Sequence, residues 1–175
     1  NQEKFLGRCL RSLLDQTIDK DKYEIVIVDD GSIDKTKFIV DAFIDPKSSL
    51  IKYYKNEINK GLPYSLNLGI NKSQGEYIVR VDSDDFVNKN FLNLLSLYLD
   101  TNPESYAVGC DYLLIDNEEQ IIKRINCQMD PIACGIMFRK YTLLKIGLYD
   151  EKFKLHEDKE LRIRFLKNYS IDRLK

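Results

Sequence analysis

The sequence predicts an α/β fold in which helices flank a mostly parallel sheet, with a small antiparallel excursion in the C-terminal half. Two observations lead to this prediction. Short runs rich in β-branched residues alternate with segments whose apolar residues recur at helical spacing, and this alternation stops near Tyr106. The 175 residues contain no internal repeat, low-complexity segment or linker, so we expect a single domain over residues 1–175.

Residues 1–100 carry the regular alternation. The apolar residues between Phe5 and Leu14 recur at helical spacing, whereas the run 23–28 is apolar nearly throughout, as in a buried parallel strand. The expected elements are a helix over 5–14, a strand over 23–28, a helix over 34–44 with Phe38, Ile39 and Phe43 inward, a strand over 50–54, a helix over 62–75, a strand over 76–81 and a helix over 91–101.

The pattern changes in residues 101–175. Two apolar runs, 106–115 and 120–125, flank Asp116-Asn117-Glu118-Glu119, which is typical of an antiparallel hairpin. After the hairpin we expect an apolar segment over 131–138, a short helix over 139–146 that ends at Gly147, a charged helix over 156–167 and a final strand over 169–174.

The charge balance and the cysteines exclude several classes of protein. Lys and Arg number 27 and Asp and Glu number 28, so no overall positive field favours nucleic-acid binding. No apolar run approaches the roughly 20 residues that span a bilayer, and no signal-peptide pattern opens the chain. The cysteines are Cys9, Cys110, Cys127 and Cys134, and the absence of a C-x-x-C pair argues against a zinc ribbon or a thioredoxin-like motif. Because no secretory signal is visible, we expect reduced thiols in a cytoplasmic protein rather than disulfides.

Acidic clusters follow two of the expected strands directly. Asp29-Asp30-Gly31-Ser32 follows the strand over 23–28, and Asp82-Ser83-Asp84-Asp85 follows the strand over 76–81. Ligands of open α/β sheets bind beyond the carboxyl ends of the strands, and a divalent ion that carries a phosphorylated ligand would hold two such clusters together. On an extended segment, Asp82 and Asp84 would face the same ligand. The alternative for each cluster is a turn followed by a helix cap.

A third acidic cluster, His156-Glu157-Asp158, begins the expected helix over 156–167. A carboxylate there can act as a general base that takes a proton from a substrate hydroxyl. The alternative is a structural role, since carboxylates also stabilise the N-terminus of a helix through its macrodipole. His156 is the only histidine in the chain, which argues against a zinc site.

These motifs, in this order and over nearly the whole chain, resemble those of the family 2 glycosyltransferases, nucleotide-sugar enzymes with the GT-A fold. The resemblance rests on a first helix that begins Asn1-x-x-x-Phe5-Leu6, on Val28-Asp29-Asp30-Gly31-Ser32, Asn59-x-Gly61, Asn67-x-Gly69 and Gly75-Glu76-Tyr77-Ile78, and on Asp82-x-Asp84-Asp85, Gly135-Ile136-Met137-Phe138-Arg139, Gly147-x-Tyr149-Asp150-Glu151 and Glu157-Asp158-x-x-Leu161-x-x-Arg164.

The resemblance implies an inverting transfer of a sugar from a nucleotide-sugar, first of all a UDP-sugar, to a saccharide, lipid-linked or protein acceptor in cell-surface glycan synthesis. Residues 1–100 would form the nucleotide-binding half and residues 101–175 the acceptor-side half. The implied roles are nucleotide binding for Asp29, Asp30 and Asp82, ligation of Mn²⁺ or Mg²⁺ for Asp84, and general-base catalysis for Asp158, with Glu157, Gly135 and Asp85 on the side of the acceptor and donor sugar.

The chain departs from the family pattern at three places. Relatives begin with a strand that ends just before the position of Asn1, and many carry Arg where this chain has Leu66. Relatives also continue beyond the last helix, so peripheral attachment to the inner face of the membrane through further segments is an expectation. The alternative functions are a sugar-nucleotide pyrophosphorylase, against which the lack of a Gly-rich basic loop argues, and a non-catalytic nucleotide-sugar binding module.

Overall fold

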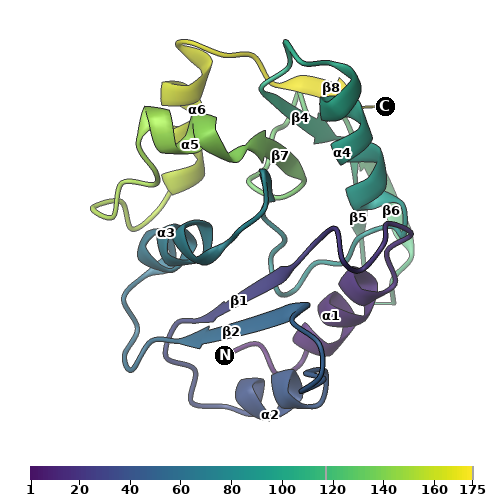
Figure 1. The fold of residues 1–175 in the computed structure, drawn as a ribbon, viewed down its shortest axis with the longest axis vertical. Coiled ribbons are helices and arrows are strands. Elements are labelled where there is room, and N and C mark those ends of the chain that lie inside the picture. The colour runs from purple at the N-terminus through teal and green to yellow at the C-terminus, as the bar shows by residue number, and fades with distance from the viewer. Residues whose placement is uncertain (117, 175) are drawn as a thin grey trace.

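The computed structural model describes residues 1–116 and 118–174, and Asn117, in the expected hairpin turn, lies outside them. In Figure 1, β1, β2, α1 and α2 lie at one end of the molecule, α5 and α6 lie at the other, and α3 lies between. The helices are α1 (Leu6–Leu14), α2 (Thr36–Asp41), α3 (Leu62–Lys72), α4 (Phe91–Thr101), α5 (Lys140–Ile146) and α6 (Glu157–Leu166). The strands are β1 (Ile25–Asp29), β2 (Ile51–Lys55), β3 (Tyr77–Val79), β4 (Ala107–Cys110), β5 (Tyr112–Ile115), β6 (Ile121–Ile125), β7 (Ile136–Arg139) and β8 (Asp172–Leu174).

The strands of the described residues form three separate sheets. β1 and β2 are parallel, the second sheet has the order β3-β7-β4-β8, and β5 pairs with β6 as an antiparallel hairpin. The expected α/β class and the antiparallel excursion are confirmed, but the parallel character holds only in part, because β7 runs antiparallel to both β3 and β4. The chain enters β7 from the hairpin rather than from a helical crossover, so β7 runs back alongside β4 in the opposite direction.

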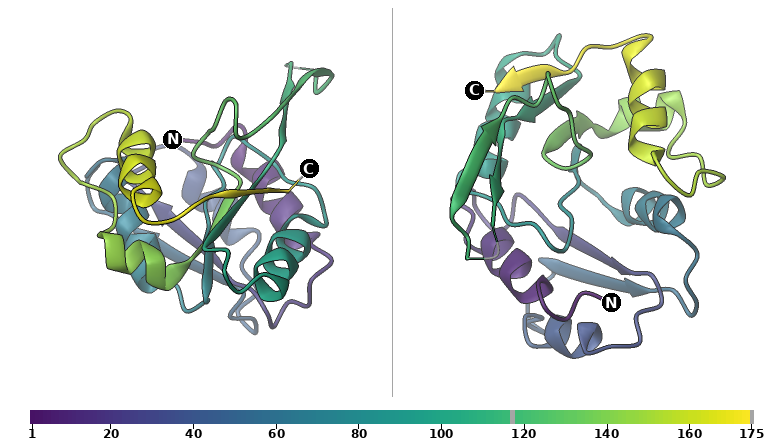
Figure 2. Two further views of the ribbon diagram at one scale, coloured as in Figure 1. Left: turned by 90° about the horizontal axis from the view of Figure 1, so that it is seen from above. Right: turned by 180° about the vertical axis from the view of Figure 1, so that it is seen from behind.

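The hairpin reaches back to the first helix. It extends away from the rest of the C-terminal half, and its tip comes down beside α1 (Figure 2). Arg8 of α1 pairs there with Glu119, with 2.8 Å between the guanidinium nitrogen and the carboxylate oxygen. This contact joins the two halves of the chain close to the acidic segment that follows β3.

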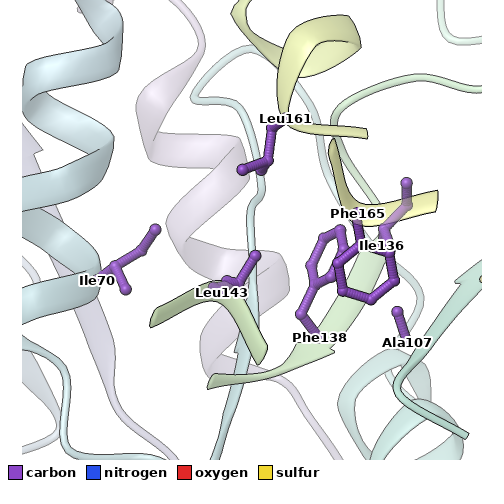
Figure 3. Packing of buried hydrophobic residues seen from close by; sticks show 7 residues of the cluster. All are labelled: Ile70, Ala107, Ile136, Phe138, Leu143, Leu161 and Phe165. Atoms are coloured by element: carbon purple, nitrogen blue, oxygen red, sulfur yellow. The ribbon is translucent and has the colours of Figure 1, made fainter. Parts of the chain in front are cut away.

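One hydrophobic cluster fixes α3, α5 and α6 against β4 and β7 (Figure 3). Phe138 of β7 meets Phe165 of α6 edge to face, with ring centroids 5.0 Å apart, and Phe165 is fully buried. The members of the cluster are Ile70, Ala107, Ile136, Phe138, Leu143, Leu161 and Phe165. Because this packing holds α6 against β4 and β7, it also positions the acidic cluster that opens that helix.

Leu143 and its neighbour Leu144 offer a matched test of this cluster. Leu143 is 2% exposed and Leu144 is 51% exposed, although both lie on α5. We expect Leu143→Ala to lower the free energy of unfolding by about 2–3 kcal/mol, because it removes buried methyl groups and leaves a cavity. Leu144→Ala should change it by less than about 0.5 kcal/mol. Urea denaturation measures both, and equal effects would contradict the packing described here.

The inward face of α2 differs from the expectation. Phe38 was expected to point inward, but it is 74% exposed, whereas Thr36 and Val40 are buried. The helix is shorter than predicted and ends at Asp41, so its buried face is set by the pair at i and i+4. Ile39 and Phe43 are partly buried and pack against the cluster that α1, α2 and β1 share.

None of the helices in the described part of the chain is long and apolar enough to cross a membrane. All four cysteines are free: Cys9 and Cys127 are buried, and Cys110 and Cys134 are half-buried.

Candidate active site

The carboxyl end of β1 carries Asp29, whose side chain is turned into the protein. One carboxylate oxygen accepts a hydrogen bond from the Ser32 N–H at 2.7 Å, and the other accepts one from the Tyr53 hydroxyl at 2.6 Å. Burial alone would raise the pKa of Asp29, but these hydrogen bonds outweigh it, and the pKa lies below its usual value. Asp29 is therefore an ionised acceptor that shapes the turn after β1.

Asp30 holds the neighbouring loop in the same way. Its carboxylate accepts hydrogen bonds from the backbone N–H groups of Lys60 and Gly61, each at 2.8 Å, and from the Asn56 side chain at 2.7 Å. Gly31 has φ +75°, and a Cβ there would stand 2.7 Å from the Asn59 nitrogen, so this close approach requires glycine. The sequence motif Asp-Asp-Gly-Ser thus joins β1 to residues 59–61, and both carboxylates already accept protein hydrogen bonds.

The segment after β3 forms a tight acidic turn. The Asp85 N–H donates to the Asp82 carbonyl at 3.0 Å, and α1 holds the same turn through its Arg8 guanidinium, which donates to the Asp84 carbonyl at 2.8 Å. Ligand atoms of Asp82, Asp85 and Cys134 all lie within 4.8 Å of one another. Asp84 is exposed, and among the described residues it does not belong to that group of ligand atoms. The turn therefore brings carboxylate oxygens of Asp82 and Asp85 within 4.8 Å of each other.

The carboxylates of this turn interact unfavourably. Desolvation raises the pKa of Asp85, the Cys134 thiol lowers it, and the carboxylates of Asp82 and Asp84 raise it, so that it lies above its usual value. A bound cation would relieve this repulsion.

Arg80 connects the acidic turn to α6, and the sequence analysis did not single it out. Its guanidinium donates to both carboxylate oxygens of Asp82, at 2.6 and 3.1 Å, and to Glu157 at 3.1 Å. The Arg80 and Glu157 side chains are 13% and 10% exposed. Burial alone would lower the pKa of Arg80, but the contact with Asp82 raises it above its usual value, so the guanidinium stays charged. The sequence signal that could have indicated this contact is the spacing of Arg80 and Asp82, because residues i and i+2 of an extended segment point to the same side of it.

Glu157 and Asp158 begin α6 directly after His156, which has a left-handed backbone with φ 62°. Glu157 is buried and faces Arg80, whereas Asp158 is half-buried and lies 3.7 Å from the Arg162 guanidinium one helical turn away. The pKa of Tyr149 is raised by burial, which the Arg80 charge opposes and the charges of Glu157 and Asp158 reinforce. The Tyr149 ring thus shares one site with Arg80 and the start of α6.

Two side chains fasten the loop that carries Tyr149. The Asn67 side-chain amide of α3 accepts from the Tyr149 N–H and donates to the Tyr149 carbonyl, both at 2.9 Å. From the other side, Arg164 of α6 donates to the carbonyls of Ile146 at 2.8 Å and Leu148 at 2.7 Å. Asn67 and Arg164, which belong to two of the motifs that carry the family resemblance, therefore have a structural function in holding this loop.

Gly135 precedes β7 and links it to the end of β3. Its N–H donates to the Arg80 carbonyl at 3.3 Å, and its φ is +76°. A Cβ at this position would stand 3.5 Å from the Cys110 sulfur. Gly135 therefore lies beside the acidic turn through its backbone, and its expected role toward a sugar stays a prediction.

The described contacts join the acidic turn after β3 to the carboxylate-bearing helix α6 through Arg80. A family model described as glycosyl transferase family 2 matches residues 1–160. The chain belongs to glycosyl transferase family 2. The family that the motifs suggested is thereby confirmed.

Curated relatives of this family 2 chain are bacterial proteins, and several are named as glycosyltransferases. Glycosyltransferase GlyG of Streptococcus pneumoniae serotype 4 is 34% identical over 112 residues, which are 64% of this chain and 36% of GlyG. The poly(ribitol-phosphate) beta-N-acetylglucosaminyltransferase TarS of Staphylococcus aureus is 35% identical over 101 residues, which are 57% of this chain and 17% of TarS. The minor teichoic acid biosynthesis protein GgaA of Bacillus subtilis is 29% identical over 176 residues, covering 90% of this chain and 39% of GgaA. The chain thus spans less than half the length of these relatives.

Solved structures confirm the GT-A fold of the family 2 chain. Crystalline S. aureus TarS superposes with a TM-score of 0.85 at 24% identity, over 100% of this chain and 33% of TarS. The mannosyltransferase PcManGT from Pyrobaculum calidifontis, solved with GDP-Man and Mn²⁺, superposes with a TM-score of 0.77 at 19% identity, over 99% of this chain and 52% of that chain. At these identities the likeness concerns the fold.

The acidic turn fits a divalent metal ion. Asp82 and Asp85 provide carboxylate oxygens, which Mg²⁺ and Mn²⁺ prefer, within 4.8 Å of each other. The third member of the group, the Cys134 thiol, is a softer ligand, and burial raises its pKa, so the carboxylates are the better donors. The expected ion, Mn²⁺ or Mg²⁺, thus has a candidate site, and the expected contribution of Asp84 remains a prediction.

Proposed function

We propose that this domain transfers a sugar from a nucleotide-sugar, a UDP-sugar in the first instance, to an acceptor hydroxyl with inversion, in a reaction that depends on Mn²⁺ or Mg²⁺. The observation that carries the proposal is the bridge made by Arg80. It links Asp82 of the acidic turn, at 2.6 Å, to Glu157 at the start of α6, at 3.1 Å. A candidate ion site and a candidate base thereby belong to one site.

The proposed division of roles follows the contacts. Asp82 and Asp85, with Asp84 beside them, would hold the ion, which would supply positive charge to stabilise the departing diphosphate. Asp29 and Asp30 order the turn and loop against which the nucleoside lies, consistent with their hydrogen bonds to Ser32 and Gly61. Asp158 takes the proton of the acceptor hydroxyl as that oxygen attacks. Glu157 is bound to Arg80, so it is less available than Asp158 for proton transfer.

The relatives support the donor and acceptor classes of this proposal. TarS has been solved with UDP and with UDP-GlcNAc, and the name of TarS specifies a poly(ribitol-phosphate) acceptor. GgaA is named for teichoic acid synthesis. We therefore propose a hydroxyl of a cell-surface polysaccharide or glycoconjugate as the acceptor. A cytoplasmic location at the inner face of the membrane accompanies the proposal as a prediction.

Binding of UDP is expected to depend on the divalent ion. We expect removal of Mn²⁺ with a chelator to weaken the affinity for UDP by about tenfold or more, because the ion screens the diphosphate from the acidic turn. Isothermal titration calorimetry with and without Mn²⁺ measures this. Uridine, which lacks the diphosphate, is the matched control and should show no dependence on Mn²⁺. UDP affinity that ignores the ion would exclude the metal-dependent mechanism.

Turnover separates the proposed transferase from the alternatives. A screen of nucleotide-sugars for metal-dependent hydrolysis should find at least one donor that releases its nucleoside diphosphate. Release of pyrophosphate from a nucleoside triphosphate and a sugar phosphate would instead indicate the pyrophosphorylase. Binding without any turnover would indicate a non-catalytic module.

A further inference from the structure

Arg80 binds both oxygens of the Asp82 carboxylate. Its Nε donates to one oxygen at 2.6 Å, and its Nη2 donates to the other at 3.1 Å. Two N–H···O bonds from one planar guanidinium fix the direction of a carboxylate, which a single hydrogen bond does not. The contact therefore restricts how the Asp82 side chain can turn, and Asp82 is one of the two carboxylates proposed to hold the ion.

The contact leaves part of the Asp82 carboxylate free for an ion. An ionised carboxylate has about four lone-pair sites, and Arg80 takes one on each oxygen. The Asp82 side chain is 37% exposed and that of Arg80 is 13% exposed, so the guanidinium lies on the buried side of the carboxylate. The remaining sites can be reached from outside, and a carboxylate oxygen of Asp85 lies within 4.8 Å.

The backbones of Arg80 and Asp82 are held by other contacts. The Arg80 carbonyl accepts from the Gly135 N–H at 3.3 Å, which joins the end of β3 to the segment before β7. The Asp82 carbonyl accepts from the Asp85 N–H at 3.0 Å and from the Cys9 thiol at 3.6 Å. Because neither backbone is free to move with the side chains, the direction of the Asp82 carboxylate depends on the guanidinium.

A fixed cation beside an ion ligand would by itself weaken ion binding, because like charges repel. Glu157 offsets this repulsion. Its carboxylate accepts a hydrogen bond from Nη1 of Arg80 at 3.1 Å, and its side chain is 10% exposed, so water screens the pair little. The opposite charges of Arg80 and Glu157 largely cancel at the ion site. The pair thus holds Asp82 without adding a net positive charge beside the ion.

We propose that Arg80 is a positioning residue of the ion site and that Glu157 is its neutralising anchor rather than a catalytic group. Together they hold Asp82 in the direction in which it can bind Mn²⁺ or Mg²⁺ with Asp85. The first turn of α6 thereby sets the ion affinity of the turn after β3. The inference rests on the proposed function, because the ion belongs to that reaction.

The test replaces the pair as a unit. Arg80→Met combined with Glu157→Gln removes the two bonds to Asp82 and leaves the net charge unchanged. Replacement of a buried ion pair by uncharged residues is often neutral for stability, so this double variant should fold. We expect its affinity for Mn²⁺ alone to fall about tenfold or more, as is typical when a partner that orients a metal ligand is removed. Electron paramagnetic resonance of free Mn²⁺ measures the affinity, and urea denaturation shows that the variant is folded.

A second variant keeps the charges and changes the geometry. Arg80→Lys retains the ion pair with Glu157 but cannot donate two bonds from one plane to Asp82. It should also lower the affinity for Mn²⁺, although less than the double variant does. This variant decides the question if the double variant does not fold.

Lys37 and Asp41 of α2 provide the matched control. They form an ion pair on the surface, with side chains 48% and 50% exposed. Lys37→Met combined with Asp41→Asn makes the same kind of exchange without a change in net charge. It should leave the affinity for Mn²⁺ unchanged.

Equal Mn²⁺ affinity of the unaltered chain and the folded double variant would overturn the inference. A higher affinity of the double variant would also overturn it, because Arg80 would then compete with the ion for Asp82. The same holds if the α2 control loses as much affinity, or if the double variant does not fold and Arg80→Lys binds Mn²⁺ as the unaltered chain does. Failure of the proposed ion site is distinct, because the unaltered chain itself would then bind no Mn²⁺.

Discussion

Replacement of Asp158 by Asn should reduce the rate of sugar transfer by about 10²- to 10⁴-fold, the contribution that a general base typically makes. The amide keeps the size of the side chain but cannot accept the acceptor's proton. Because Asp158 is half-buried and lies 3.7 Å from Arg162, the helix should tolerate the change. Affinity for UDP should stay the same, since the proposed donor site lies at the turns after β1 and β3.

The measurement is steady-state transfer together with UDP affinity. Asp19→Asn is a matched control, because it makes the same chemical change at a carboxylate that is 73% exposed and pairs with Lys22 in a surface contact. It should leave both quantities unchanged. Transfer by Asp158→Asn at the original rate, with UDP affinity intact, would show that another group is the base.

Replacement of Arg80 by Met should lower the free energy of unfolding by about 3–5 kcal/mol, because removal of one partner leaves a buried charge without compensation. Glu157, whose side chain is 10% exposed, is the charge left unpaired. Asp82 is 37% exposed, so water offsets part of its loss, and the lower end of the range is expected. Arg80→Lys retains the charge but not the planar fork, so its effect should be intermediate.

A double-mutant cycle identifies the pair as the cause. Glu157→Gln removes the charge that Arg80 neutralises, so Arg80→Met should cost at least about 1 kcal/mol less in that background. Urea denaturation of the four proteins measures the coupling. Additive effects would mean that Arg80 acts on stability without Glu157, and the connection between the acidic turn and α6 would then need another explanation.

The elements with strong local patterns could be predicted from the sequence. The helical spacing of apolar residues from Phe5 to Leu14 predicted α1, and the apolar run before Asp29 predicted β1. Both elements are buried on one or both faces, and such burial produces a recognisable pattern of apolar residues in the sequence. No pattern of apolar residues in the sequence indicates the direction of β7. It depends on pairing with β3 and β4, which are distant in sequence, so the sheet was expected to be more parallel than it is.

Only part of the candidate site could be predicted from the sequence. The three acidic clusters stood out because each follows a strand or opens a helix. Arg80 did not, because its partner Glu157 is 77 residues away. The expectation that Asp82 and Asp84 face one ligand assumed an extended segment, whereas the hydrogen bond from Asp85 to Asp82 forms a turn, and turns change which side chains meet.

The attachment of residues 147–149 has a consequence for how the protein can vary. Asn67 and Arg164 tie this backbone to α3 and α6, whereas residues 152–156, just before Glu157, are all exposed. Substitutions in that exposed stretch alter the surface beside the proposed base without releasing the loop or disturbing the buried Arg80 bridge. The chain thus separates a hydrogen-bonded frame from an adjacent surface on which a new acceptor preference can evolve at little cost in stability.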